Sequence, residues 1–191
     1  KRADLDIILN ETRRLDRIVN QIIDYARPRD LMPTTWAVDG IVDEVLKLLD
    51  TRLETQRIAV IRSCQPDLTA HADRDQIKQV LLNLCHNSLD AMKQEGELRI
   101  AAGDGARTGD AGIFIEISDT GSGIAQKDLA QVFQPFFTTG EQHGTGLALA
   151  ICRNIAEAHG GDISLTSEPG RGTTARLWLP LRPSPDQGIA L

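Results

Sequence analysis

The chain has 191 residues, of which 41% are hydrophobic and 25% are charged, and its formal net charge is −6. This balance is typical of a globular protein and argues against disordered, collagen-like and disulfide-scaffold classes. An acidic chain is a poor match for nucleic acid or an anionic membrane, so we expect no nucleic-acid partner and no membrane contact. Its cysteines, Cys64, Cys85 and Cys152, are widely spaced and form no C-x-x-C pair. They indicate reduced thiols and a cytoplasmic location.

Residues 4–26 are expected to form one long helix. Apolar or small side chains recur at steps of three and four residues, the seam of a coiled coil, at Leu5, Ile8, Thr12, Leu15, Val19, Ile22 and Ala26. A helix with so narrow a seam needs a partner, so we expect a homodimer through residues 4–26. Packing of this helix on its own domain is the alternative. Pro28 and Pro33 then mark a linker.

The pattern changes at residue 34 to a mixture of short strands and long helices. Strands are predicted over residues 35–38, 57–62, 68–71, 97–102, 112–118, 162–167 and 173–180, and helices over 39–54, 73–92 and 145–159. Asp39 and Asp73 are expected to cap the first two helices, with Leu48 on the inner face of the first. The glycine- and aspartate-rich run 103–111 is expected to be a turn.

Most of the predicted strands are joined by hairpins, and the helices come in a few long pieces. This predicts an α+β fold, a two-layer sandwich whose mixed, largely antiparallel sheet is covered by helices on one face. One long coiled-coil-type helix would precede the sandwich.

Three polar side chains share one stripe of the predicted helix 73–92. Asn83, Asn87 and Asp90 lie at positions i, i+4 and i+7. Asparagine is a poor helix former, so two in one stripe need an explanation. A solvated helix face is one explanation; a set of oxygen donors is the other, because an asparagine carbonyl can ligate Mg²⁺.

An acidic residue ends the predicted strand 112–118 and is followed by two glycines. Asp119 precedes Gly121 and Gly123, which would let the backbone approach a ligand closely. A carboxylate in a largely apolar pocket accepts a hydrogen bond from an amino group, which distinguishes adenine from guanine. A plain turn would also account for this short motif.

The segment 140–147 places glycines directly before a predicted helix. Free N–H groups and the positive end of the helix dipole at such a place attract phosphate. Just before it, three of the four phenylalanines fall at Phe133, Phe136 and Phe137. Core packing would explain Phe133, whereas the Pro-Phe-Phe sequence indicates an anchor for a lid.

In this order and spacing, the three motifs resemble the N, G1, F and G2 boxes of sensor histidine kinases. These kinases belong to the ATPase superfamily that also contains DNA gyrase B, Hsp90 and MutL. The resemblance covers about residues 34–181 and is strongest to the nitrogen-regulatory class. Residues 1–30 resemble the second helix of the dimerisation and histidine-phosphotransfer hairpin, including the Arg27-Pro28 exit.

The resemblance implies a role for each matching residue. Asn87 would ligate Mg²⁺ with Asn83 as its catalytic neighbour near the phosphates, and Asp119 would bind the adenine amine. The expected nucleotide-binding residues are Asn87, Asp90, Asp119, Gly121, Gly123, Ile124, Phe136, Phe137, Thr138, Thr139, His143, Gly144, Thr145, Gly146 and Leu147. The implied ligands are ATP and Mg²⁺, and the implied protein partner is the receiver domain of a response regulator.

The sequence departs from the family pattern in three places. The mildest is Ala148, where family members often have glycine. Gly140 follows Thr139 where the family commonly has lysine, and His143 or Arg153 is a candidate substitute for the lost phosphate contact. None of the histidines, His71, His86, His143 and His159, lies in an H-E-x-x-x-P motif. We therefore expect the phosphoacceptor histidine on a hairpin helix outside this sequence, which also lacks an initial methionine.

The domain boundaries follow from the resemblance. Residues 1–32 would be the second hairpin helix and linker, 33–182 the ATP-binding catalytic domain, and 183–191 a flexible tail. The expected activity is that of a protein-histidine kinase. The alternatives are an ATP-hydrolysing relative or a non-catalytic pseudokinase that docks in a nucleotide-dependent way. Asn83 stands where hydrolysing relatives have a glutamate base, and an amide cannot take up a proton.

Overall fold

In the computed structural model of the chain, the described residues are 12, 19, 30–107, 109–138 and 145–181. The predicted coiled-coil helix (4–26), apart from residues 12 and 19, and the predicted tail (183–191) lie outside them. The homodimer through residues 4–26 and the domain boundaries therefore stay predictions.

The main layer is a five-stranded sheet with the order β2-β4-β5-β7-β6. Its strands are β2 (Ile58–Cys64), β4 (Gly96–Arg107), β5 (Asp110–Asp119), β6 (Asp162–Glu168) and β7 (Gly172–Pro180). Only the β2–β4 pair is parallel, and the three other pairs are antiparallel. The predicted mixed, largely antiparallel sheet is thus confirmed.

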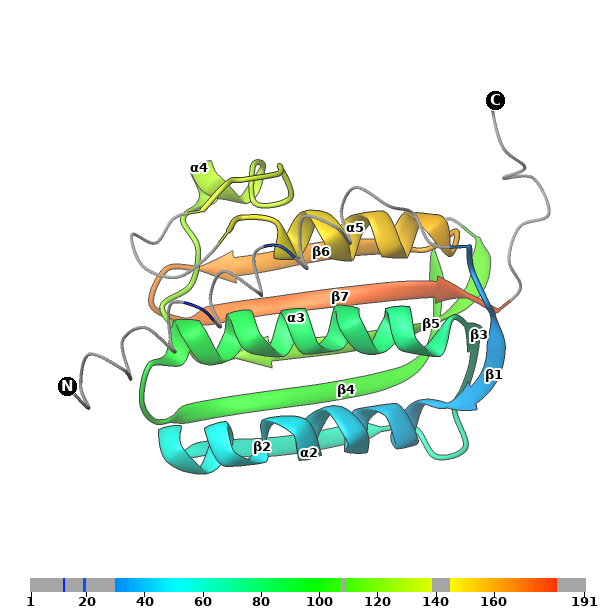
Figure 1. Ribbon diagram of the computed structural model, residues 1–191, viewed down its shortest axis with the longest axis horizontal. Coiled ribbons are helices and arrows are strands. Elements are labelled where there is room, and N and C mark those ends of the chain that lie inside the picture. Colours follow the sequence, from blue (N-terminus) through cyan, green and yellow to red (C-terminus); the bar gives the residue numbers. More distant parts are fainter. Residues whose placement is uncertain (1–11, 13–18, 20–29, 108, 139–144, 182–191) are drawn as a thin grey trace.

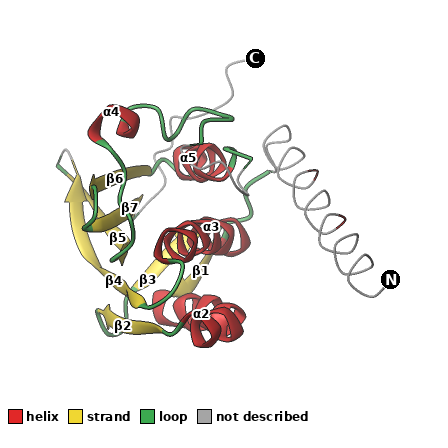
Figure 2. Cartoon of the chain, turned by 90° about the vertical axis from the view of Figure 1, so that its left-hand side faces the viewer, coloured by secondary structure: helices red, strands yellow, loops and turns green. Residues whose placement is uncertain are grey.

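Helices form the second layer and cover one face of this sheet (Figures 1 and 2). They are α2 (Val38–Gln56), α3 (Arg74–Met92) and α5 (Ala148–Ala158). A single helical turn, α4 (Gln126–Leu129), lies near β6, and β1 (Thr34–Ala37) pairs with β3 (Thr69–Ala72) in a separate two-stranded sheet. The α+β two-layer sandwich is confirmed for the described residues.

The core lies between the two layers. Ile113, Ile115 and Ile117 alternate along β5 and are buried on the helix-covered face. Between them, Glu116 points to the other face, where it pairs with Arg176 of β7. Each fully buried aliphatic side chain contributes about 1.5–3 kcal/mol, so this two-residue period fixes which face of the sheet the helices cover.

Two local expectations for the first helix were wrong. Asp39 does not cap α2, because the N-cap position is Ala37 and Asp39 instead pairs with Arg62 of β2. Leu48 is 62% exposed rather than facing the core. The cap predicted for the second helix is confirmed, since Asp73 accepts the N–H groups of residues 75 and 76.

The glycine-rich run 103–111 is largely strand and not the predicted turn. β4 continues to Arg107 and β5 begins at Asp110. A Cβ at either Gly103 or Gly105 would lie 3.2 Å from the ring of Phe114 on β5. These glycines therefore make room for an aromatic ring, which a pattern based on turn composition cannot detect.

Candidate nucleotide-binding site

The described parts of the predicted motifs lie together at one end of the two-layer domain. There, the C-terminal half of α3 lies beside the N-terminus of α5 and the end of β5 (Figure 1). The two helices run antiparallel, because Cys152 of α5 contacts the carbonyl of Val80 on α3 and His159 contacts Asp73. Nearby, the N–H of Ser122 donates to the carbonyl of Ala91 on α3 at 3.2 Å.

Asp119 is the buried acid of this end of the domain. It ends β5 and is only 8% exposed. Its Oδ1 accepts the N–H of Gly121 at 2.9 Å and the N–H of Thr173 at 3.2 Å. No donor among the described residues reaches Oδ2. The carboxylate is thus fixed through Oδ1, and Oδ2 is available to accept a hydrogen bond from a ligand.

Close packing accounts for the two predicted glycines after Asp119. A Cβ on Gly121 would lie 2.7 Å from the Cβ of Ala91 on α3. Gly123 has a φ of +68°, and a Cβ there would lie 2.1 Å from the carbonyl oxygen of Glu168. Gly121 is therefore fixed against the helix, and Gly123 against the β6–β7 hairpin.

The β6–β7 hairpin contributes contacts to this end of the domain that no sequence motif indicates. Ser167 accepts the N–H of Ile124 at 2.8 Å, and Thr173 donates its N–H to Asp119. Gly172 passes so close that a Cβ on it would lie 1.8 Å from the carbonyl oxygen of Asp119. The only sequence signal is the short run 168–172, which indicates a tight hairpin but not where it packs.

The two asparagines of α3 lie on partly buried positions of the same stripe. The side chain of Asn83 hydrogen-bonds Cys152 of α5, which opposes the effect of burial; burial dominates and raises the pKa of this thiol to about 12. Asn83 therefore faces the α3–α5 contact, and the thiol stays protonated. Asn87 lies one turn further toward the Asp119 end of the domain.

The side chain of Asp90, the third residue of the polar stripe on α3, contacts α2. Its side chain is 66% exposed and pairs with Arg52 of α2, with Nη2 and Oδ1 at 2.5 Å. Arg52 also contacts His86 at 3.2 Å. Asp90 thus belongs to a charged cluster between α2 and α3, although its place on the helix was predicted correctly as part of the polar stripe.

The Phe136–Phe137 segment is attached to the start of α5. The N–H of Phe136 donates to the carbonyl of Gly146 at 3.0 Å, and both residues have a φ of +67°. A Cβ on Gly146 would lie 2.4 Å from the carbonyl carbon of Phe136. Phe136 is 68% exposed, whereas Phe137 packs against the core.

A cation–π contact lies just before this segment. The guanidinium of Arg153 on α5 lies 4.0 Å from the ring centre of Phe133. Phe133 is buried, which favours core packing as its explanation. Arg153 is therefore held against a ring, and nothing in this geometry supports it as a substitute phosphate contact.

The remaining predicted residues flank α5. Leu147 is 1% exposed, and its N–H donates to the hydroxyl of Thr145 at 3.3 Å. Thr138 is exposed. Thr139, His143 and Gly144 lie outside the described residues, so their expected contacts with a nucleotide stay predictions. Helix α5 begins at residue 148 rather than at 145.

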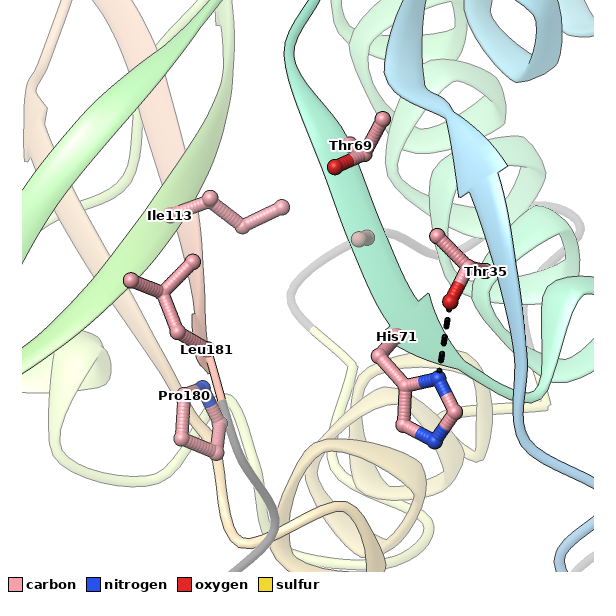
Figure 3. Close-up of a pocket in the computed structure, with 7 residues that line it drawn as sticks. Thr35, Thr69, His71, Ile113, Pro180 and Leu181 are labelled. Carbon is pink, nitrogen blue, oxygen red and sulfur yellow. Dashed lines mark hydrogen bonds between the residues drawn. The ribbon is translucent and has the colours of Figure 1, made fainter.

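A pocket of about 190 Å³ lies at the opposite end of the domain (Figure 3). It is lined by Thr35, Thr69, Ala70, His71, Ile113, Pro180 and Leu181. Ile113 is six strand positions before Asp119, a distance of roughly 20 Å. This pocket is therefore separate from the site of the predicted motifs.

Comparison with known proteins places the chain in a family. The sequence profile described as "Histidine kinase-, DNA gyrase B-, and HSP90-like ATPase" matches residues 72–183. The chain is 34% identical over 176 residues to the sensor histidine kinase ZraS of Escherichia coli K12, covering 92% of this chain and 37% of ZraS. It is 34% identical over 186 residues to the signal transduction histidine-protein kinase AtoS of the same organism, covering 97% of this chain and 30% of AtoS.

The fold is also shared with solved structures. The catalytic domain of histidine kinase ThkA is 30% identical with a TM-score of 0.71, over 80% of this chain and 97% of that domain. ThkA in complex with the response regulator protein TrrA matches with 30% identity and a TM-score of 0.78, over 93% of this chain and 50% of that one. The chain therefore belongs to the histidine kinase-, DNA gyrase B- and HSP90-like ATPases, and within them to the catalytic domains of histidine kinases.

The chain spans only about a third of the length of the two Escherichia coli kinases that it matches. None of the helices in the described part of the chain has the length and apolar character needed to cross a membrane.

Proposed function

We propose that this chain binds Mg–ATP at the end of α3 and α5, and that the protein to which it belongs transfers the γ-phosphoryl group to a histidine. Asp119 carries the proposal. Its Oδ1 accepts hydrogen bonds from two backbone N–H groups. Its Oδ2 can therefore accept a hydrogen bond from the amino group of adenine. A guanine at this place would offer a carbonyl to a carboxylate, so the site favours ATP over GTP.

The asparagine side chains of α3 suit a Mg²⁺ ion that is held mainly by phosphates and water. The described residues contain no cluster of three or more His, Cys, Asp or Glu side chains that would hold a metal ion. Mg²⁺ is commonly held by one or two protein oxygens together with substrate phosphates and water. The amide oxygen of Asn87 would supply such a ligand, with Asn83 one turn away. When bound, the ion neutralises phosphate charge.

Different residues of the chain would contact the base and the phosphates of ATP. Gly121 and Gly123 let the backbone after Asp119 pack closely on α3 and on the β6–β7 hairpin, and so shape the wall of the base site. The first turn of α5, which follows Gly146 and Leu147, offers backbone N–H groups to the phosphates. Phe136 and Phe137 fix the segment that precedes α5. Thr138, Thr139, His143, Gly144, Thr145 and Ile124 complete the proposed contacts.

Phosphoryl transfer is favoured over hydrolysis by the chemistry of Asn83. Transfer requires mainly positioning and charge neutralisation, whereas hydrolysis by the related ATPases requires a base that activates water. Asn83 faces Cys152, whose thiol is protonated, so no base is present at this position. A pseudokinase would keep the same pocket and is separated from a kinase only by a transfer assay.

The proposed partners follow from this function. A response regulator would accept the phosphoryl group on an aspartate, as the ThkA–TrrA complex supports for a related kinase. We further propose that residues 4–26 form the second helix of a dimerisation hairpin, and that the chain acts in the cytoplasm, where ATP is available. A strictly monomeric parent kinase in light scattering would contradict the dimer.

Calorimetric titration with a non-hydrolysable ATP analogue, with and without Mg²⁺, tests the proposal. We expect binding that prefers adenine over guanine and that strengthens with Mg²⁺. Asn87→Ala should remove most of the Mg²⁺ effect and leave the adenine preference intact. An absence of binding with either nucleotide would contradict the proposal.

A further inference from the structure

The two helices of the proposed nucleotide site share a second meeting point at their other ends. The part of α3 from its cap at Asp73 to Asn87 runs antiparallel to α5, whose caps are Leu147 and His159. At 1.5 Å per residue, these spans are about 20 Å and about 18 Å. The Asp73–His159 contact therefore lies at the ends of both helices that are remote from the proposed nucleotide site.

His159 joins the ends of these helices with both ring nitrogens. It is 8% exposed, and its Nδ1 lies 2.7 Å from the carbonyl oxygen of Ile155. A carbonyl only accepts, so Nδ1 carries the proton and Nε2 is an acceptor. The N–H of Asp73 donates to this Nε2 at 3.0 Å. The last turn of α5 is thus bonded to the residue that caps α3.

Asp73 in turn holds the chain that enters the domain. Its Oδ1 accepts the N–H groups of Asp75 and Gln76, both at 3.1 Å, and so caps α3. Its Oδ2 accepts the N–H of Met32, also at 3.1 Å. The side chain of Met32 is 77% exposed, so this residue is held through its backbone.

The entering chain is fixed at the same place by a short ladder. Thr34 is paired with Ala72, directly before Asp73. The indole N–H of Trp36, a residue that is 8% exposed, donates to the carbonyl of Ala72 at 3.0 Å. The attachment of residues 32–37 is therefore to the cap of α3 and, through it, to the end of α5.

We propose that Met32, Asp73 and His159 form a joint that sets the orientation of the nucleotide site toward the phosphoacceptor. Asp73 and His159 are then positioning residues for phosphoryl transfer that do not touch ATP. This inference rests on the proposed function and adds to it a route by which the preceding segment controls the transfer step.

The test separates binding from transfer with variants at residue 32. Met32→Pro removes the N–H and keeps Asp73 and its cap, whereas Met32→Ala keeps the N–H and is the matched control. Asp73→Asn removes the acceptor for Met32, because the single amide oxygen remains with the helix cap. Affinity for a non-hydrolysable ATP analogue is measured on this chain, and transfer on the parent kinase that includes its phosphoacceptor.

We expect Met32→Pro and Asp73→Asn to bind the analogue within about twofold of the wild type and to transfer phosphate at least tenfold more slowly, with Met32→Ala unchanged. Transfer by Met32→Pro at the wild-type rate would overturn the joint. Transfer that falls only in proportion to affinity would overturn it too, because the defect would then lie in the nucleotide site.

Hydrogen exchange gives a readout that does not depend on transfer. In the wild-type chain, the ATP analogue should slow exchange of the backbone N–H groups of Met32 and Asp73. If the analogue binds and exchange there is unchanged, the joint is wrong while the proposed function stands. If the analogue does not bind at all, both fail.

Discussion

The backbone N–H of Thr173 at the start of β7 donates to Oδ1 of Asp119 at the end of β5, 54 positions earlier in the sequence. Because β5 and β7 are neighbours in the sheet, this bond is part of the fold itself. The carboxylate is thereby oriented before a ligand arrives, and the proposed base-recognition group is preorganised.

Asp119→Asn should separate ligand recognition from folding. The amide oxygen can keep the bonds from Gly121 and Thr173, but the amide nitrogen would then face the adenine amine, donor against donor. An unpaired buried donor costs about 1–3 kcal/mol, which lowers affinity for an ATP analogue roughly 5- to 150-fold. Calorimetry measures this loss. Glu116→Gln, the same change on the opposite face of β5, is the control and should leave affinity unchanged.

Gly146→Ala should weaken nucleotide binding through the backbone. A Cβ at this position would lie 2.4 Å from the carbonyl carbon of Phe136, so the segment before α5 must shift. Gly170→Ala is the matched control, because Gly170 has a similar φ of +75° and no atom within 4 Å of a Cβ. Both changes carry a strain cost of about 1 kcal/mol in thermal unfolding. Only Gly146→Ala should also lower affinity; equal affinities would contradict the proposed role.

Asp73 should make the stability of the domain sensitive to acid. Burial alone would raise the pKa of Asp73, but hydrogen bonds from the N–H groups of Gln76, Met32 and Asp75 lower it below its usual value of 3.8. A lowered folded-state pKa means that the group stabilises the fold above its unfolded pKa, and that this contribution is lost as the pH falls through the folded value.

The comparison that tests this is Asp73→Ala across pH. At pH 7 the variant should be less stable by about 1 kcal/mol, because the cap is lost. Below pH 3.8 the difference in free energy of unfolding from the wild type should shrink as Asp73 is protonated. Urea unfolding at several pH values measures it, and a difference that does not change with pH would refute the electrostatic part of the explanation.

Arg153 should contribute to stability and not to phosphate binding. Its guanidinium lies over the ring of Phe133, a contact that contributes about 0.5–1 kcal/mol. Arg153→Met should therefore lower thermal stability slightly and leave affinity for an ATP analogue within about twofold, with Arg153→Lys between it and the wild type. A tenfold loss of affinity in Arg153→Met would instead assign Arg153 to the phosphates.

Features that depend on near neighbours along the chain can be predicted from local sequence alone. The cap of α3 at Asp73 is one, because a cap bonds N–H groups two and three residues ahead. The alternation of Ile113, Ile115 and Ile117 is another, because a strand turns every second side chain to the same face. The order of the motifs also indicated the family that the comparisons confirm.

Features whose partners lie far away in the sequence emerge only when separate elements pack together. The composition around Gly103 predicts a turn, whereas in the fold Gly103 makes room for the ring of Phe114. The polar stripe predicts Asp90 as a nucleotide-binding residue, and local sequence gives no sign of its ion pair with Arg52 of α2. Each of these contacts forms only when separate elements pack together, and the free energy of that packing outweighs local preference.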